Sequence, residues 1–431
     1  MNSDFISIGE VLTYLKEVNG LEDRTQIVQD FIDKENESTG NAYDRYLENG
    51  SATFANVVTE YSGVKKACIL WNVNHYLSLN RNSNVIEKAC HAIRQFGTGC
   101  GTSASSCGMT SLHKEIEKKV AELVGKEKVV LFPTGFTANL GSISFLVGSK
   151  DLIIFDRECH SSIINGIRLS KAKKWISFKH NNVADLEIKL QRFKDLYENI
   201  FVIVESAYSM SGDLSPLKEI TSLKSTYNFY LYVDEAHTFG IYGEKGQGYC
   251  YDQGVSDQVD FIISTLSKAT ASIGGFFAAD QKYCSLLRFS DPYLFQACLT
   301  PADAAVILAS LEEIENNPLL IKELHAKNNY MRDLLISKGF NLGNSKSPII
   351  PIFIEDHSKL RMVVNELYIK GIYSTPIVFP AVKMNEGRIR FIINYAHTKE
   401  QIDYTVQMLE DICSKHQIIR NNANELLANN I

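Results

Sequence analysis

The residue best suited to covalent chemistry is Lys268, which closes the segment STLSK (264–268) directly after the apolar run 261–263. A lysine amine becomes nucleophilic when its neighbours lower its pKa, and the hydroxyl of Thr265 could bind a phosphate beside it. Lys268 is therefore a candidate for imine formation with a carbonyl cofactor. The alternative is a solvated loop lysine, which is the commoner role of this residue type.

Asp234 and His237 follow a second apolar run, 229–233. A carboxylate at the end of a strand can hold a cationic ring nitrogen, and His237 projects from the same turn. His160 follows a third run, 152–155, where an imidazole can lie flat on an aromatic cofactor ring. The alternatives are an aspartate that caps the next helix and a hydrogen-bonded structural histidine.

Thr134, Gly135 and Phe136 join the run 129–132 to a helical stretch. Glycine lets the backbone approach a phosphate, and the N-terminus of a helix supplies N–H donors. The segment is not a G-x-G-x-x-G motif and lacks the Gly-Lys-Ser/Thr of a P-loop, so it indicates a nucleotide only weakly. The alternative is a plain turn.

Arg390 lies in an expected strand, 388–393. An arginine that faces a cleft suits bidentate binding of a carboxylate, although a surface ion pair is its commoner use. Each of these signals is weak alone. Together, a phosphate turn, a stacking histidine, a ring-nitrogen aspartate, an imine lysine and a carboxylate-binding arginine are the parts that hold pyridoxal 5′-phosphate (PLP) and an amino acid.

The elements that position these residues follow from an alternation of apolar runs with amphipathic helices, which begins near residue 126. Fully apolar runs indicate an α/β fold with a parallel sheet covered on both faces, and such sheets bind ligands at the carboxyl ends of their strands. Beyond residue 300 we expect a smaller α+β unit, with helices at 301–315, 318–338, 357–370 and 398–413 and strands at 348–354 and 388–393. The expected domains are an N-terminal helical arm (1–60), a large domain (61–299) and a small C-terminal domain (300–431).

Composition limits the classes of function. The 431 residues include 44 Lys and Arg against 50 Asp and Glu, and the net charge of −6 gives no field that would attract nucleic acid. The nine cysteines form no C-x-x-C pair, so we expect neither a disulfide framework nor a metal site. No secretory signal is visible and no apolar stretch approaches the length of a membrane span, which favours a cytoplasmic protein.

Taken together, these segments resemble those of the α-oxoamine synthases, a branch of the fold-type-I PLP enzymes. The resemblance covers about residues 65–413. It is carried by NHYLSL (74–79), TGFTANLG (134–141), the stretch 156–166, SMSGD (209–213), VDEAH (233–237), TLSK (265–268) and Arg390 with His397 seven residues later.

Within the family, three segments resemble the bacterial serine palmitoyltransferases: FGTGC (96–100), ASIGGF (271–276) and SPIIP (347–351). Three positions depart from the family pattern. Ala104 stands where the family has arginine, and Ser78 and Ser206 stand where it has glycine. Ala104 either belongs to a loop that faces solvent or leaves a wider, less cationic site that favours a long acyl chain.

The resemblance implies a mostly parallel seven-stranded sheet in the large domain and a role for each site residue. Lys268 would carry PLP and act as the base at the substrate Cα, while Asp234 would keep the pyridine nitrogen protonated. His160 would stack on the ring, His237 would bind its phenolic oxygen, and Asn74 and Arg390 would bind the substrate. The implied cofactor-binding residues are Thr134, Gly135, Phe136, His160, Ser209, Asp234, His237, Thr265, Lys268 and Thr300. Thr300 would reach the cofactor phosphate of the neighbouring subunit in a homodimer.

The implied reaction is a decarboxylative Claisen condensation of an amino acid, L-serine first, with a long-chain acyl thioester such as palmitoyl-CoA. It gives a 3-oxosphinganine-type α-aminoketone, CO2 and CoA, and the lipid product would allow peripheral contact with a membrane. The alternatives within the family are 8-amino-7-oxononanoate synthase, 2-amino-3-ketobutyrate CoA ligase and an aminoketone autoinducer synthase. The alternatives outside this activity are a PLP-dependent aminotransferase and a catalytically dead partner subunit, against which Lys268 argues.

Overall fold

The computed structural model describes residues 8–38, 44–379, 381–383 and 385–419, which form two compact units. The large unit comprises Asn74–Ser209 and Asp213–Leu324, and the small unit comprises Met1–Val73, Met210–Gly212 and His325–Ile431. These units do not follow the boundaries expected at residues 60 and 300. Helix α12 (Pro301–Asn316) belongs to the large unit because its apolar side chains, among them Ile307, are buried in the core of that unit.

The large unit is built on a seven-stranded sheet in the order β4-β10-β9-β8-β7-β5-β6. The strands from β9 to β6 are mutually parallel, whereas β10 pairs antiparallel with both of its neighbours. The bounds are β4 (Lys128–Phe132), β5 (Leu152–Asp156), β6 (Lys174–Phe178), β7 (Ile200–Glu205), β8 (Tyr230–Asp234), β9 (Phe261–Thr265) and β10 (Gly275–Ala279). The predicted α/β fold with a mostly parallel seven-stranded sheet is confirmed.

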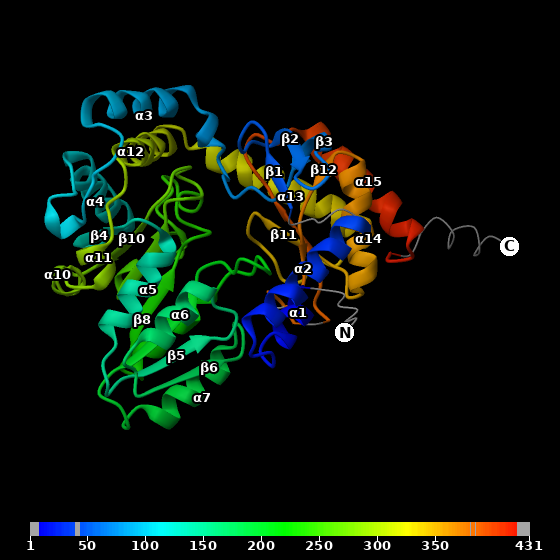
Figure 1. Ribbon diagram of the computed structural model, residues 1–431. Coiled ribbons are helices and arrows are strands. Elements are labelled where there is room, and N and C mark those ends of the chain that lie inside the picture. Colours follow the sequence, from blue (N-terminus) through cyan, green and yellow to red (C-terminus); the bar gives the residue numbers. More distant parts are fainter. Residues whose placement is uncertain (1–7, 39–43, 380, 384, 420–431) are drawn as a thin grey trace. The chain divides into compact units, whose positions relative to one another are not determined.

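Helices cover both faces of this sheet (Figure 1). Leu152 and Ile154 of β5 are buried in the core on one face, and Ile153 and Phe155 are buried in the core on the other. Successive strand residues point to opposite faces, so a sheet buried on both sides requires the fully apolar runs seen in the sequence. The first face packs against α4 (Ser111–Val124), α7 (Val183–Phe193), α8 (Leu217–Ser222) and α12, and the second against α5 (Gly135–Leu146), α6 (Ser161–Leu169), α10 (Gln281–Leu287) and α11 (Asp291–Phe295).

The small unit contains two smaller sheets, in the orders β1-β2-β3-β12 and β11-β14-β13. Their strands are β1 (Arg45–Leu47), β2 (Phe54–Thr59), β3 (Lys65–Leu70), β11 (Ile349–Phe353), β12 (Ile372–Tyr373), β13 (Pro376–Ile377) and β14 (Arg388–Ile392). The helices are α1 (Ile8–Tyr14), α2 (Leu21–Ser38), α14 (His357–Ile369) and α15 (Lys399–Lys415), while α13 (Leu319–Ser337) crosses the boundary between the units. The segment expected as a helical arm therefore contains strands as well as α1 and α2, and its residues 1–7 and 39–43 lie outside the described part.

Within the described ranges, no helix combines the length and the apolar character that crossing a membrane requires. All nine cysteines are free thiols.

Candidate active site

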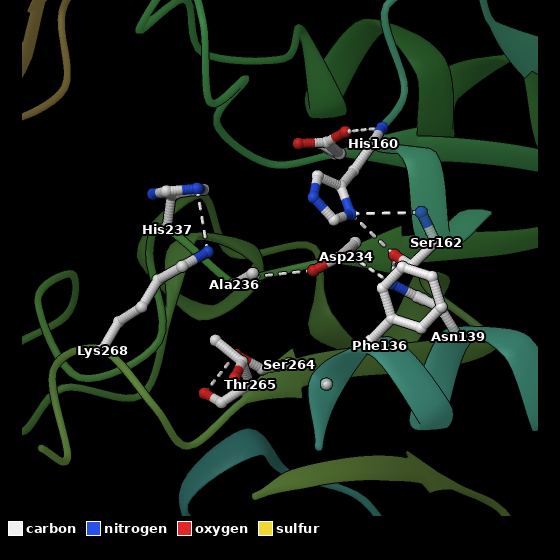
Figure 2. Close-up of a pocket in the computed structure, with 12 residues that line it drawn as sticks. Phe136, Asn139, His160, Ser162, Asp234, Ala236, His237, Ser264, Thr265 and Lys268 are labelled. Atoms are coloured by element: carbon white, nitrogen blue, oxygen red, sulfur yellow. Dashed lines mark hydrogen bonds between the residues drawn. The ribbon is translucent and has the colours of Figure 1, made fainter. Parts of the chain in front are cut away.

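A cavity of about 180 Å³ lies at the carboxyl edge of the large sheet, where β7, β8 and β9 end. Seven predicted residues line it: Gly135, Phe136, His160, Asp234, His237, Thr265 and Lys268. Figure 2 shows Lys268 pointing toward His237, and Asp234 lying between Ala236 and Asn139. The rule that parallel sheets bind ligands at the carboxyl ends of their strands therefore located the cavity from the sequence.

The other predicted site residues lie outside the lining of this cavity. Thr134 is the N-cap of α5, directly before Gly135. The hydroxyl of Thr300 donates to Asp303 at the start of α12, 2.5 Å away. Asn74 and Ser209 belong to the large unit but are not among the residues that line the cavity. Arg390 belongs to β14 of the small unit.

Asp234 is the last residue of β8 and is 4% exposed. Its Oδ1 accepts the N–H of Ala236 at 2.8 Å, and its Oδ2 accepts from Nδ2 of Asn139 at 2.6 Å. A carboxylate only accepts hydrogen bonds, so these two donors fix its orientation.

Glu205 ends β7 and is the register partner of Asp234 on the neighbouring strand. Burial raises the pKa of Glu205 well above its usual range, and the charge of Asp234 raises it further. Both effects favour the uncharged form of the Glu205 carboxyl. The carboxyl of Glu205 accepts the backbone N–H of His160.

His160 is the N-cap of α6, and its Nδ1 accepts the backbone N–H of Ser162 at 3.2 Å. Oγ of Ser162 lies 2.8 Å from the same nitrogen. Burial lowers the pKa of His160 and outweighs the opposing charge of Asp234, so the imidazole is neutral near pH 7. The ring of Phe136 approaches it edge-on, with 6.4 Å between the centroids.

His237 is hydrogen-bonded both to Lys268 and to Tyr76, which lies in the segment 74–79 that precedes the large sheet in the sequence. Its Nε2 lies 2.8 Å from Nζ of Lys268, and its Nδ1 lies 2.6 Å from the hydroxyl of Tyr76. The segment NHYLSL was singled out in the sequence for Asn74, whereas Tyr76 is the member that bonds to this site histidine. A tyrosine that is 1% exposed and bonded to a site residue has a role in positioning that histidine.

The start of α5 forms the corner of the cavity that suits an anion. A Cβ atom on Gly135 would lie 2.6 Å from Cβ of Thr265, and one on Gly275 would lie 2.5 Å from the carbonyl oxygen of Thr134. Only glycine therefore lets the helix begin this close to β9 and β10. The first N–H groups of a helix have no acceptor within it, so the start of α5, beside the polar side chains of Ser264 and Thr265, fits a phosphate.

Five further residues line the cavity and were not predicted as site residues: Asn139, Ser162, Glu205, Ala236 and Ser264. Two of them could have been predicted as site residues from their positions in the sequence. Glu205 follows the apolar run 201–204 just as Asp234 follows its own run. Asn139 stands four residues after Gly135 and therefore shares its face of α5.

Ala104 is partly exposed and the three residues after it, 105–107, are exposed, so both alternatives given for this segment stay predictions. Ala104 is half-buried and lines a small apolar pocket with Phe132, Tyr293 and Leu299. It packs against the core on the face covered by α5 and α6. An arginine here would displace apolar neighbours rather than project freely from the loop.

A family model described as aminotransferase class I and II matches residues 66–409. The chain belongs to this family. Serine palmitoyltransferase of Bacteroides thetaiotaomicron is 39% identical over 342 residues, which cover 79% of this chain and 86% of the relative. 8-Amino-7-oxononanoate synthase of Thermoanaerobacter pseudethanolicus is 35% identical over 355 residues, which cover 82% of this chain and 90% of the relative. Within the family the chain is an α-oxoamine synthase, an acyltransferase.

A solved structure of a lysine-to-alanine variant of serine palmitoyltransferase from S. paucimobilis, with a bound PLP–myriocin aldimine, superposes on this α-oxoamine synthase with a TM-score of 0.86. The match covers 93% of this chain and 100% of that chain at 27% identity. The fold-type-I architecture expected from the resemblance is thereby confirmed.

Proposed function

We propose that this α-oxoamine synthase binds PLP in the cavity and condenses L-serine with a long-chain acyl-CoA thioester, with loss of CO2. The observation that carries the proposal is the convergence of Lys268, Asp234, His160 and His237 in one cavity, beside a helix N-terminus that suits a phosphate. The similarity to serine palmitoyltransferase of Bacteroides thetaiotaomicron supports serine and a long acyl chain over the substrates of the other family members.

The donor set assigns a partner to each part of PLP. Lys268 would hold the cofactor through Nζ, Asp234 would pair with the ring nitrogen, and the start of α5 with Thr265 would bind the phosphate. His160 would cover the ring while neutral, and His237 would bind the phenolic oxygen. When bound, PLP supplies an electron-accepting ring that stabilises negative charge at the substrate Cα.

Lys268 would also move the Cα proton. Its Nζ is held 2.8 Å from Nε2 of His237, while the other ring nitrogen of His237 is bonded to Tyr76. The two bonds fix the imidazole, so the amine keeps a polar partner in each protonation state. A positioned amine of this kind contributes about 10²–10⁴-fold to a proton transfer.

The remaining assignments are also part of the proposal. Arg390 would clamp the substrate carboxylate through a bidentate charge-assisted pair, with Asn74 beside it. Thr134 and Ser209 would contribute to cofactor binding. The enzyme would act as a homodimer in which Thr300 reaches the cofactor phosphate of the neighbouring subunit, and sedimentation of an active monomer would contradict this.

The test is CoA release measured for acyl-CoA donors from acetyl to stearoyl, each with serine, glycine and alanine. We expect serine to be preferred, and kcat/KM to rise with chain length because each buried methylene contributes about 0.8 kcal/mol. Lys268→Ala should abolish release with every donor. Preference for a short or dicarboxylic donor with alanine would instead support an activity like that of 8-amino-7-oxononanoate synthase, and a keto acid formed without thioester would support an aminotransferase.

A further inference from the structure

We propose that Asn139 is a positioning residue that holds the Asp234 carboxylate and, through Ser162, fixes the ring proton of His160 on Nε2. The inference rests on the proposed function only for the roles of Asp234 and His160 toward PLP. The hydrogen-bond network itself is a property of the described chain, and Figure 2 shows Asn139 linked by hydrogen bonds to Asp234 and to Ser162.

The orientation of the Asn139 amide is set from behind by Tyr232. The phenol hydroxyl lies 2.7 Å from Oδ1 of Asn139 and 2.8 Å from Oγ of Ser142. Burial raises the pKa of Tyr232 well above its usual range, so the phenol keeps its proton and donates it. The oxygen of the amide therefore faces Tyr232, and its NH2 group faces the cavity.

The NH2 group then has two acceptors. Nδ2 of Asn139 lies 2.6 Å from Oδ2 of Asp234 and 3.0 Å from Oγ of Ser162. An amide NH2 can only donate, so one hydrogen goes to the carboxylate and the other to the hydroxyl. Asn139, which is 3% exposed, thereby links the residue proposed for the ring nitrogen to the histidine proposed for the ring face.

The tautomer of His160 follows. Nδ1 of His160 accepts the backbone N–H of Ser162, so this nitrogen presents a lone pair. The Ser162 hydroxyl, which accepts from Asn139, gives its own proton to the same nitrogen at 2.8 Å. A neutral imidazole with two donors at Nδ1 carries its proton on Nε2.

A glycine makes this alignment of helices possible. A Cβ atom on Gly166 of α6 would lie 2.9 Å from the carbonyl oxygen of Asn139 and 3.0 Å from Cβ of Ile143, both on α5. Only glycine lets the two helices approach this closely, and the approach brings Ser162 into reach of Asn139. The charged and titratable groups around His160 are Asp234, Lys268 and Glu205.

The direct test is two-bond ¹H–¹⁵N correlation NMR of the full-length chain labelled with [¹⁵N]histidine, before and after addition of PLP, with His160→Gln to assign the signals. We expect the Nε2–H tautomer for His160 at pH 7.5, with Nδ1 unprotonated. An Nδ1–H tautomer or an imidazolium in the unmodified chain would overturn the proposal. If the tautomer is as expected but no condensation occurs, the proposed function fails and this inference stands.

Asn139→Asp sharpens the test, since the new carboxylate can only accept. The carboxylate would accept the Ser162 hydroxyl proton in place of His160, so the His160 signals should shift toward protonation of Nδ1. It would also repel the Asp234 carboxylate, so the affinity for PLP should fall at least about 10-fold. The matched control is Asn199→Asp. Asn199 also donates to a carboxylate, that of Asp151, at 2.8 Å, but this pair lies at the amino ends of β7 and β5, away from the carboxyl ends that form the cavity. The control should leave the His160 signals and PLP affinity unchanged. An unchanged His160 spectrum in Asn139→Asp would contradict the inference. If Asn139→Asp does not fold, Tyr232→Phe should give the same change in the His160 signals.

Discussion

His160 and His180 follow neighbouring parallel strands, β5 and β6, yet His160 is neutral and His180 carries a positive charge. Amide and hydroxyl donors converge on His160, and burial lowers its pKa, so it is neutral. His180 lies 3.0 Å from Oδ1 of Asp156 and 3.3 Å from Oδ2 of Asp213. Burial alone would lower the pKa of His180, but these two hydrogen bonds outweigh it and raise the pKa to about 10.

Two histidines that follow neighbouring strands therefore differ in what they do: His160 lines the cavity proposed for the cofactor, and His180 links two carboxylates within the fold. Both ring nitrogens of His180 bond to carboxylates. This charged bridge links Asp156, at the end of β5, to the turn at Asp213. His160 uses one nitrogen to cap α6 and keeps a neutral ring at the cavity. Substitutions on the two sides should therefore separate activity from stability.

The largest expected effect is on the cavity side. Asp234→Asn removes the charge proposed for the ring nitrogen while keeping the shape of the side chain. We expect kcat/KM to fall by about 10³-fold, in the range seen when one preorganised electrostatic partner is lost. Steady-state kinetics with serine and palmitoyl-CoA check this, and a loss of less than 10-fold would contradict the role of Asp234.

On the His180 side, His180→Asn should lower the free energy of unfolding. It removes the cation between two carboxylates, and Asp156 is fully buried. Breaking one partner of a buried pair costs about 3 kcal/mol of unfolding free energy. Urea unfolding measures this, with the expectation that kcat/KM changes less than 10-fold. A variant as stable as the unmodified protein would show that the bridge contributes nothing.

The pH dependence of stability gives an intermediate effect. The pKa of His180 is about 10 in the folded chain, above the ordinary value of 6.5 for histidine, so the folded chain binds this proton more tightly than the unfolded chain. The stabilisation is complete below pH 6.5 and is lost as the pH rises toward 10. The difference in unfolding free energy between the unmodified protein and His180→Asn should therefore shrink across this window, and a constant difference would contradict the assignment.

The smallest expected effect concerns Ser206, which stands where the family has glycine. Its hydroxyl lies 3.0 Å from the carbonyl oxygen of Asp234 and 2.7 Å from Oγ1 of Thr238. Ser206→Ala should lower the unfolding free energy by about 1 kcal/mol, the usual worth of one hydrogen bond, with kcat/KM within about threefold. A large loss of activity would place Ser206 in the catalytic machinery.

The fold was largely predictable from the sequence where strands are buried on both faces. The run 152–155 is apolar throughout because both faces of β5 are covered. β6 was missed because its side chains are mostly exposed or half-buried at the edge of the sheet, and β10 because GFFAA contains no β-branched residue. The unit to which α12 belongs was not predictable, since an amphipathic pattern shows which face is buried but not the core that buries it.

The site was predictable where a polar residue follows a buried strand, as at Asp234 and Lys268. Asn139 was missed as a site residue because its motif was interpreted as a phosphate turn, although it shares the cavity-facing side of α5 with Gly135. Tyr76 was missed because its bond to His237 joins residues 161 positions apart in the sequence. Contacts of this range depend on packing, which residue type and local spacing do not encode.

The most direct test of the account is the fate of the carboxyl carbon of L-serine labelled at C1. We expect the label to be released as CO2 only when palmitoyl-CoA is present, in equal amount with CoA and a 3-oxosphinganine-type aminoketone, and not to be released by Lys268→Ala. Label retained in a keto acid, or release of CO2 that does not depend on the thioester, would contradict the proposed condensation.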